Sequence, residues 1–145
     1  MKRRRALPLL LALPLGLRAQ QRVAPAAGVP VVCFLALATR ESDAPSVAAF
    51  REGMRDLGHA EGRSYVFVEH YAQGDMARAE AMLREQMARQ PVSVFLTPGA
   101  AAVRLILRDT QAVPIVSAGL HPRGGQTDLF ASLARPGGRV TGVSN

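Results

Sequence analysis

The sequence predicts an α/β protein built on a doubly wound, parallel sheet of five strands. Apolar, β-branched segments alternate along the chain with segments whose apolar residues have helical spacing. The connections between them are short. The first apolar segment, VPVVCFLALAT at residues 29–39, is continuous, as in a strand covered on both faces. We therefore expect strand order 2-1-3-4-5 with right-handed crossovers, as in flavodoxin-like lobes.

The expected elements follow one another in a strand–helix order. The strands are expected at residues 29–39, 65–71, 92–96, 113–119 and 138–144, and the helices at 45–57, 76–89, 97–110 and 127–134. Pro45 suits the first position of the first helix, and Gly58 suits its end. Asp75 is expected to cap the second helix. In the third, Thr97 is expected at the N-cap and Pro98 at the first helical position.

The amino-terminal residues have the pattern of a secretory signal peptide. A basic MKRRR segment precedes the apolar stretch ALPLLLALPLGL at residues 6–17, and Leu17 and Ala19 suit a leader-peptidase site. We expect residues 1–19 to be removed, residues 20–29 to form a flexible lead-in, and residues 30–145 to form the folded part, outside the cytoplasm. An uncut membrane anchor is the alternative, although the stretch is shorter than the roughly 20 residues that span a bilayer.

Composition excludes several classes of function. The whole chain has 18 Lys and Arg against 11 Asp and Glu, but five of those cations lie in the expected leader. The remainder is close to neutral and has no basic stripe with interleaved aromatic residues, so we expect no nucleic-acid partner. Cys33 is the only cysteine, which excludes an intrachain disulfide, and its apolar surroundings in the sequence favour a buried thiol.

The candidate ligand site is the rim formed by the loops that follow the first, third and fourth strands. Ligands of doubly wound sheets bind beyond the carboxyl ends of the strands. The candidate ligand-binding residues are Ser42, Asp43, Thr97, Gly99, Ala100, Ala101, Ser117, Gly119 and His121.

Each loop has a structural alternative to ligand binding. The small residues of TPGAAA, 97–102, leave the first-turn amides of a helix open to a carboxylate or phosphate, or else let the helix pack closely on its strand. Ser42 and Asp43 could bind a solute or cap the following helix. His121 could contact a ligand or lie on the surface.

Motifs for catalysis are absent from the sequence. It contains no GxGxxG, no GxxxxGK[ST] phosphate loop and no GxSxG elbow. The three histidines and Cys33 do not have metal-ligand spacing. We therefore expect a protein that is not an enzyme and has no cofactor and no metal.

Several segments together resemble the ABC-transporter substrate-binding proteins of the tryptophan/tyrosine type, which have a type I periplasmic-binding fold. They are SDAPSVAAFREGMRDLGHAEGRSYVFVEHYAQGD at 42–75, TPGAAAV at 97–103, VPIVSAG at 113–119 and LFASLARPGGRVTGVSN at 129–145. The more specific parts are AFREGMRDLG, EGR and SLARPGG followed by VTG. The resemblance implies a periplasmic protein that binds a small organic solute, possibly an amino acid, between two lobes and presents it to ABC permease subunits.

The resemblance also implies that this chain is a fragment. In that family the amino-terminal lobe ends with this Gly-Gly turn and strand, and the chain then crosses to a second lobe, which is absent here. The family usually has an acidic Asp-Pro pair where this sequence has His121 and Pro122, so the class of solute stays open. Two alternatives also stay open: a small flavodoxin-like or nucleotide-dependent enzyme, and a sensory solute-binding lobe.

Overall fold

The computed structural model describes residues 28–120, 129 and 137–143, which form a parallel five-stranded sheet. The elements are β1 (Val31–Ala36), α1 (Arg40–Asp56), β2 (Val66–Tyr71), α2 (Met76–Arg89), β3 (Val94–Thr97), α3 (Ala100–Asp109), β4 (Ile115–Ser117) and β5 (Val140–Gly142). The strand order is β2-β1-β3-β4-β5, which confirms the predicted fold class and order. All four strand pairs are parallel.

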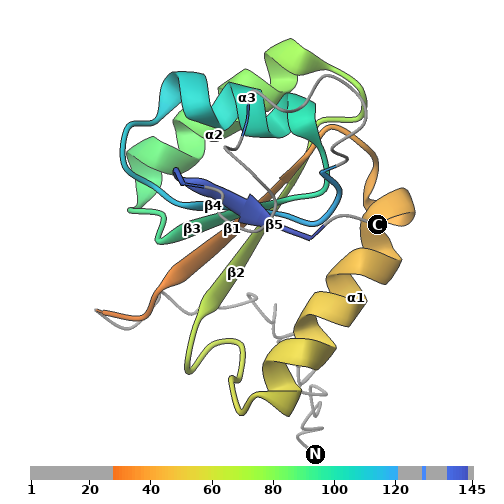
Figure 1. The fold of residues 1–145 in the computed structure, drawn as a ribbon, viewed down its shortest axis with the longest axis vertical. Helices are drawn as coiled ribbons and strands as arrows, with labels where there is room; N and C mark the ends of the chain where they lie inside the picture. Colours follow the sequence, from red (N-terminus) through yellow and green to blue (C-terminus); the bar gives the residue numbers. More distant parts are fainter. Residues whose placement is uncertain (1–27, 121–128, 130–136, 144–145) are drawn as a thin grey trace, which may run out of the picture.

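The helices lie on opposite faces of the sheet. Figure 1 shows α2 and α3 together on one face and α1 on the other. Strand order explains this arrangement. The chain moves one way across the sheet from β1 to β2 and the opposite way in every later step, so right-handed crossovers place α1 apart from the other helices.

The face under α2 and α3 carries the main core. Cys33, Phe95, Ile115 and Val140 are register partners across four strands, and each is at most 2% exposed. Helix α3 covers this row with Ile106, which is fully buried. Burying an aliphatic or aromatic side chain of this size contributes about 1.5–3 kcal/mol. This face therefore supplies most of the burial that stabilises the lobe.

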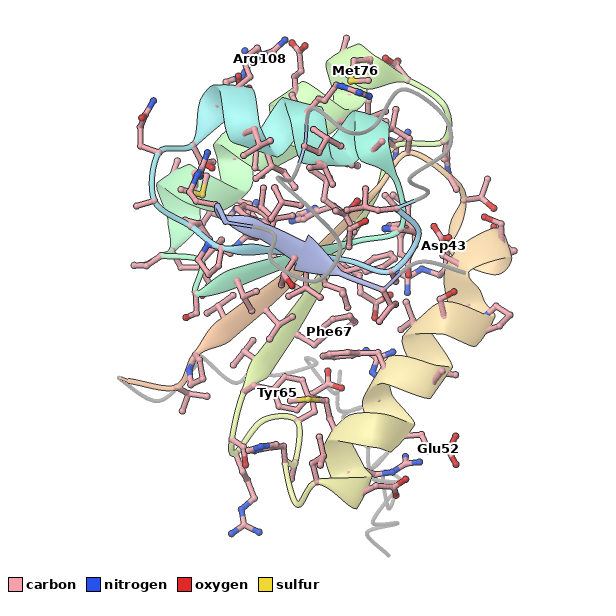
Figure 2. The ribbon with its side chains drawn as sticks, in the orientation of Figure 1. Asp43, Glu52, Tyr65, Phe67, Met76 and Arg108 are labelled. Carbon is pink, nitrogen blue, oxygen red and sulfur yellow. The ribbon has the colours of Figure 1, made fainter. Side chains whose placement is uncertain are left out.

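The face under α1 carries a smaller, aromatic cluster. The rings of Phe50 and Phe67 stack with centroids 5.0 Å apart, and Phe34 meets Tyr71 at 5.7 Å. Val47 of α1 belongs to the same cluster. Figure 2 shows Phe67 and Tyr65 between β2 and α1. These contacts place α1 over the β1–β2 side of the sheet.

Two helices begin at other residues than the sequence predicted. Helix α1 begins at Arg40, before Pro45, because Thr39 is its N-cap and accepts a hydrogen bond from the backbone N–H of Ser42 at 3.3 Å. Pro45 therefore lies inside the helix, where it leaves the carbonyl of the exposed Glu41 without its usual donor.

The predicted N-cap of the third helix is also wrong. Thr97 is the last residue of β3, where it pairs with Ser117, and Gly99 is the N-cap instead. The expected signal peptide, most of the lead-in, the helix at 127–134 and His121 lie outside the described residues. Leu129, which is described alone, is buried in the core under α2 and α3. No helix among the described residues is both long and apolar enough to cross a bilayer.

Candidate functional site

The loops after β1, β3 and β4 lie at one edge of the sheet because all strands run in the same direction. This edge is the position at which doubly wound sheets bind ligands. The described parts of the three loops include Thr39, Gly99 and Gly119. We call this edge the carboxyl rim.

The loops after β3 and β4 pack directly against each other. The backbone N–H of Ala118 donates to the Thr97 carbonyl at 3.0 Å. A Cβ atom added to Gly119 would overlap the carbonyl oxygen of Pro98. Gly119 is therefore required by close approach of two backbones, and it holds the loop after β4 against the start of α3.

Strand β5 completes this side of the rim. The backbone N–H of Val143 donates to the Ser117 carbonyl at 3.0 Å. A Cβ on Gly142 would overlap that same carbonyl oxygen. The ends of β3, β4 and β5 are thus fixed relative to one another by backbone contacts.

The loop after β1 is held by the loop after β2. The backbone N–H groups of Gln73 and Gly74 donate to the carbonyls of Ala38 and Leu37. Gln73 and Gly74 both have positive φ, 56° and 84°, and this left-handed pair turns the chain back toward β1. The segment before α1 is therefore supported by a neighbouring loop that has no predicted ligand residue.

Two buried polar atoms at the rim have no hydrogen-bond partner among the described residues. They are Oγ of Ser117, whose residue is 0% exposed, and Oδ2 of Asp43, whose residue is 8% exposed. Burial raises the pKa of Asp43. Figure 2 shows Asp43 on the side of α1 that faces the sheet, near the rim. Because buried polar groups are normally paired, these two atoms are candidates to bind a ligand. A third buried atom without a partner among the described residues is Nε2 of Gln86 in α2.

The start of α3 has only small side chains. Its N-cap, Gly99, makes no side-chain capping bond, and the next two residues are Ala100 and Ala101. The first amides of a helix lack intrahelical acceptors and carry partial positive charge, so this end favours an anion. Thr97 and Ser117 are register partners on the sheet face that α3 covers. The start of α3 and the Ser117 hydroxyl therefore lie at the carboxyl ends of two adjacent strands, β3 and β4.

The predicted residues thus have different surroundings. Ser42 is exposed, and its hydroxyl donates to the Thr39 carbonyl at 3.0 Å, so it helps to begin α1. Thr97 is 0% exposed, and Gly99 N–H donates to its hydroxyl at 3.5 Å. Asp43 and Ser117 retain unpaired oxygens. A ligand role for any of these residues stays a prediction.

A second polar cluster, which the sequence reasoning missed, lies between α1 and β2. The Glu69 carboxylate accepts hydrogen bonds from Arg40, Arg51 and the Tyr71 hydroxyl, each at 2.7 Å. Arg51 also pairs with Glu61 at 2.8 Å. Arg40 and Arg51 are three helical turns apart and so share a face of α1, which is a signal that the sequence did offer.

The charges of this cluster shift two pKa values. Partial burial alone raises the pKa of Glu69, but the hydrogen bonds from Tyr71 and Arg51 and the nearby guanidinium groups outweigh it, and the net pKa is lowered. Burial and the hydrogen bond to Glu69 raise the pKa of Tyr71 to about 12. Glu69 is therefore ionised and Tyr71 protonated near neutral pH, so the cluster is a stable ion-pair network.

Hollows in the described surface lie beside this cluster and between two helices. One of about 490 Å³ and another of about 310 Å³ both border Arg40, Glu69 and Tyr71. A third, of about 320 Å³, lies between α2 and α3 and includes Ala101. The described residues hold no group of His, Cys, Asp and Glu side chains suited to a metal ion.

Comparison with known proteins gives a likeness in structure. No protein-family model matches the chain, and no curated protein matches it. The ABC domain in complex with L-Trp from Streptococcus pneumoniae is 20% identical with a TM-score of 0.67, over 80% of this chain and 38% of that one. A conserved domain protein from Vibrio cholerae O1 biovar El Tor is 23% identical with a TM-score of 0.69, over 81% of this chain and 39% of that one.

This chain therefore spans about two fifths of the length of each neighbour. At these identities the likeness concerns the fold. The shared fold is the α/β fold with the parallel five-stranded sheet described above.

Proposed function

We propose that this chain is the amino-terminal lobe of an extracytoplasmic solute-binding protein that serves an ABC importer. The observation that carries the proposal is the buried hydroxyl of Ser117, which has no hydrogen-bond partner among the described residues and lies in the strand that pairs with β3, just before α3. A site that lacks a hydrogen-bond partner in the free protein is suited to bind one from a solute. The L-Trp held by a structural neighbour supports a small organic solute as the ligand class.

The rim offers complementary groups to a zwitterionic solute. The amides of Ala100 and Ala101 favour a carboxylate. The unpaired oxygens of Asp43 and Ser117 accept hydrogen bonds, and ionised Asp43 also favours an ammonium group. These groups bind and orient a solute, and no nucleophile or paired acid and base has been found among them. The proposed activity is binding without chemistry.

A single lobe supplies one side of such a site. The intact protein closes two lobes on the solute like a hinge. This chain covers about two fifths of each structural neighbour, so proteins of that length have room for a second lobe. Losing that lobe removes roughly half of the contacts and the exclusion of water. We propose that residues 1–19 are a signal peptide, that the mature protein is periplasmic, and that ABC permease subunits receive the closed form.

The test is a titration of the full 145-residue chain with L-tryptophan, followed by the amide NMR signals of each residue. We expect shifts at 99–101 and 117–119, with an affinity in the millimolar range, since half of a cleft is engaged. Ser117→Ala should abolish the shifts. Ser42→Ala is the matched control, because that hydroxyl already binds Thr39, and it should leave them unchanged.

Three results would contradict the proposal. Submicromolar binding by this chain would show that one lobe is a complete site. Shifts at the rim with flavin mononucleotide or ATP, and none with amino acids, would favour the nucleotide-dependent enzyme instead. A cytoplasmic product that retains Met1, detected by mass spectrometry of cell fractions, would exclude export.

A further inference from the structure

Strand β2 forms one edge of the sheet, and no described strand pairs with its outer side (Figure 1). The backbone N–H groups of Val66 and Ala72 donate inward, to β1 and the residue before it. Backbone groups alternate between the two sides of a strand, so the N–H and C=O groups of Phe67, Glu69 and Tyr71 point outward. A row of such groups is able to pair with another strand.

The sequence of β2 does not protect this edge. Edge strands are commonly shielded by proline, by lysine or by a charge on the covered face. Strand β2 is six residues long, VFVEHY, with no proline and no lysine. Its carboxylate, Glu69, lies on the face that α1 covers, but Arg40 and Arg51 balance its charge. The edge is therefore suited to accept a second strand.

Helix α1 carries, next to this edge, a row of residues that is complementary to itself. The row is Arg40, Ala44, Ala48 and Glu52, which are spaced by four and so share one side of the helix. All four line the hollow of about 490 Å³ that also borders Glu69 of β2. When two copies of the row run in opposite directions, each arginine faces a glutamate and each alanine faces an alanine. This match favours a second copy of the chain over a strand of another protein.

We propose that two copies of this chain pair through their β2 strands, antiparallel about a two-fold axis, into one continuous sheet. Phe67 then pairs with Glu69 of the partner subunit, and the axis passes beside Val68. Arg51 lies 4.9 Å over the Phe67 ring, so this register brings the partner's Arg51 toward Glu69. A shift by one residue would place Glu69 opposite the partner's Glu69, and like charges directly opposite each other are destabilising.

The position of α1 agrees with this register. The Phe50 ring contacts the rings of Tyr65 and Phe67, at 5.9 and 5.0 Å, so Phe50 is level with the residue between them. Helix α1 runs opposite to β2 because it connects two parallel strands. The centre of the row lies four residues before Phe50, a rise of about 6 Å, which is about the length of two strand residues. The centre of the row is therefore level with Val68, so one axis serves both the strands and the helices.

The spacing of the two helices fits as well. Val47 of α1 packs in one cluster with Phe34 of β1 and Tyr71 of β2, so the helix lies over the boundary between these strands. Across the axis, the two helices are about two strand spacings apart, or about 9.5 Å. Helices pack at about 8–10 Å, and the closest approach needs small side chains at the contact, such as Ala44 and Ala48.

The extent of the contact predicts a weak dimer. Strand β2 and the linings of the two hollows beside it supply most of the roughly 20–30 residues that a standard interface uses on each partner. We therefore expect a dissociation constant in the micromolar range. The loops after β3 and β4 are not part of this contact, so the dimer does not depend on the proposed solute site.

Sedimentation velocity of the full 145-residue chain, from about 1 µM to about 300 µM, tests the proposal. Glu52→Arg and Arg40→Glu should each weaken the dimer at least about tenfold, because like charges then face each other. An equimolar mixture of the two variants should associate as the parent does, because each arginine again faces a glutamate. Asp109→Arg, the same change of charge at the exposed end of α3, is the control and should leave association unchanged.

Hydrogen exchange is a second measurement that needs no change at Arg40. The amides of Phe67, Glu69 and Tyr71 should exchange at least about tenfold more slowly in the parent chain at about 300 µM than in Glu52→Arg. If Arg40→Glu does not fold, because it also loses Glu69, this measurement decides.

Three results would overturn the proposal. The first is a parent chain that stays monomeric at about 300 µM. The second is association that Glu52→Arg leaves unchanged, which would place the contact on another surface. The third is a mixture of two folded variants that does not associate although the parent does, which would exclude the facing of Arg40 and Glu52.

Discussion

The Glu69 carboxylate accepts a hydrogen bond from Arg40 at 2.7 Å, and this contact joins edge strand β2 to the first residue of α1. Arg51 binds the other oxygen of the same carboxylate, also at 2.7 Å. The Glu69 side chain is 12% exposed, so water screens these contacts less than it screens an ordinary surface pair. Glu69 therefore fixes the helix whose first turn contributes Asp43 to the rim.

Replacing Glu69 with Gln should lower the free energy of unfolding by about 1–2 kcal/mol, because Arg40 loses its carboxylate partner and Arg51 loses one of its two at a partly buried site. Urea unfolding measures the change. Glu85→Gln is the matched control, since Glu85 pairs with Arg89 on the exposed side of α2, and it should change stability by less than about 0.5 kcal/mol. Equal effects of the two variants would contradict a special role for Glu69.

Asp43 and Glu69 should have opposite pH dependences. The pKa of Glu69 is lowered in the folded protein, so its stabilisation is present above the unfolded pKa of about 4.3 and is lost as the pH falls through the folded pKa. Burial raises the pKa of Asp43, so its protonated form stabilises the fold at low pH. That contribution is lost as the pH rises through the raised folded pKa.

Asp43→Asn should therefore stabilise the lobe at pH 7 by about 1 kcal/mol and have no effect at pH 3. Thermal unfolding of the variant and the parent protein at pH 7 and pH 3 measures the change in stability at each pH. Glu52→Gln is the control, because Figure 2 shows Glu52 on the solvent side of α1. If Asp43→Asn destabilised the lobe at pH 7, the carboxylate would have a partner that the structure does not show.

Gly119→Ala should destabilise the lobe by about 2 kcal/mol, since the new methyl group would displace the Pro98 carbonyl and separate two loops of the rim. Gly53→Ala is a suitable contrast. Gly53 lies inside α1 with no atom near its added Cβ, so this change should stabilise by about 0.5–1 kcal/mol. Denaturant midpoints of Gly119→Ala and Gly53→Ala that move in the same direction would contradict the close contact between Gly119 and Pro98.

Arg139, which directly precedes β5, is hydrogen-bonded to the end of α3 and to the loop that follows it. Its guanidinium donates to the carbonyls of Leu107, Thr110 and Val113 and to the Thr110 hydroxyl, at 2.8–3.3 Å. These acceptors lie near the negative end of the helix dipole. Arg139→Ala should reduce stability by about 2 kcal/mol, and hydrogen exchange at the last turn of α3 should accelerate. Arg63→Ala, at an exposed loop position, is the control and should change neither the stability nor the hydrogen exchange of α3.

The strand order was predictable because it depends on features that extend over many residues. Alternation of elements and the rule of right-handed crossovers reduce the possible topologies to a few, of which 2-1-3-4-5 is a common doubly wound order. The helix starts were less predictable. Pro45 is a strong signal for a first helical position, but the Thr39 hydroxyl and carbonyl already bind the amides of Ser42 and Asp43, and α1 therefore begins earlier.

The candidate site was predictable in location more than in detail. Parallel strands bring their loops to one edge, so the rim follows from the topology. The sequence does not show that the Ser117 hydroxyl is unpaired, that the Ser42 hydroxyl is already bonded, or that Gly119 touches Pro98. Each of these depends on contacts between residues on different loops or on local hydrogen-bond geometry, which periodicity does not encode.

The placement of Cys33 at the centre of the sheet has a consequence for oxidation. Burial raises the pKa of its thiol to about 12, so almost no thiolate exists in the folded protein at physiological pH. Because the thiolate is the reactive species in disulfide exchange, the folded lobe is inert toward oxidants and toward thiols of other proteins. The Cys33 thiol can therefore form mixed disulfides only while β1 is still uncovered during folding.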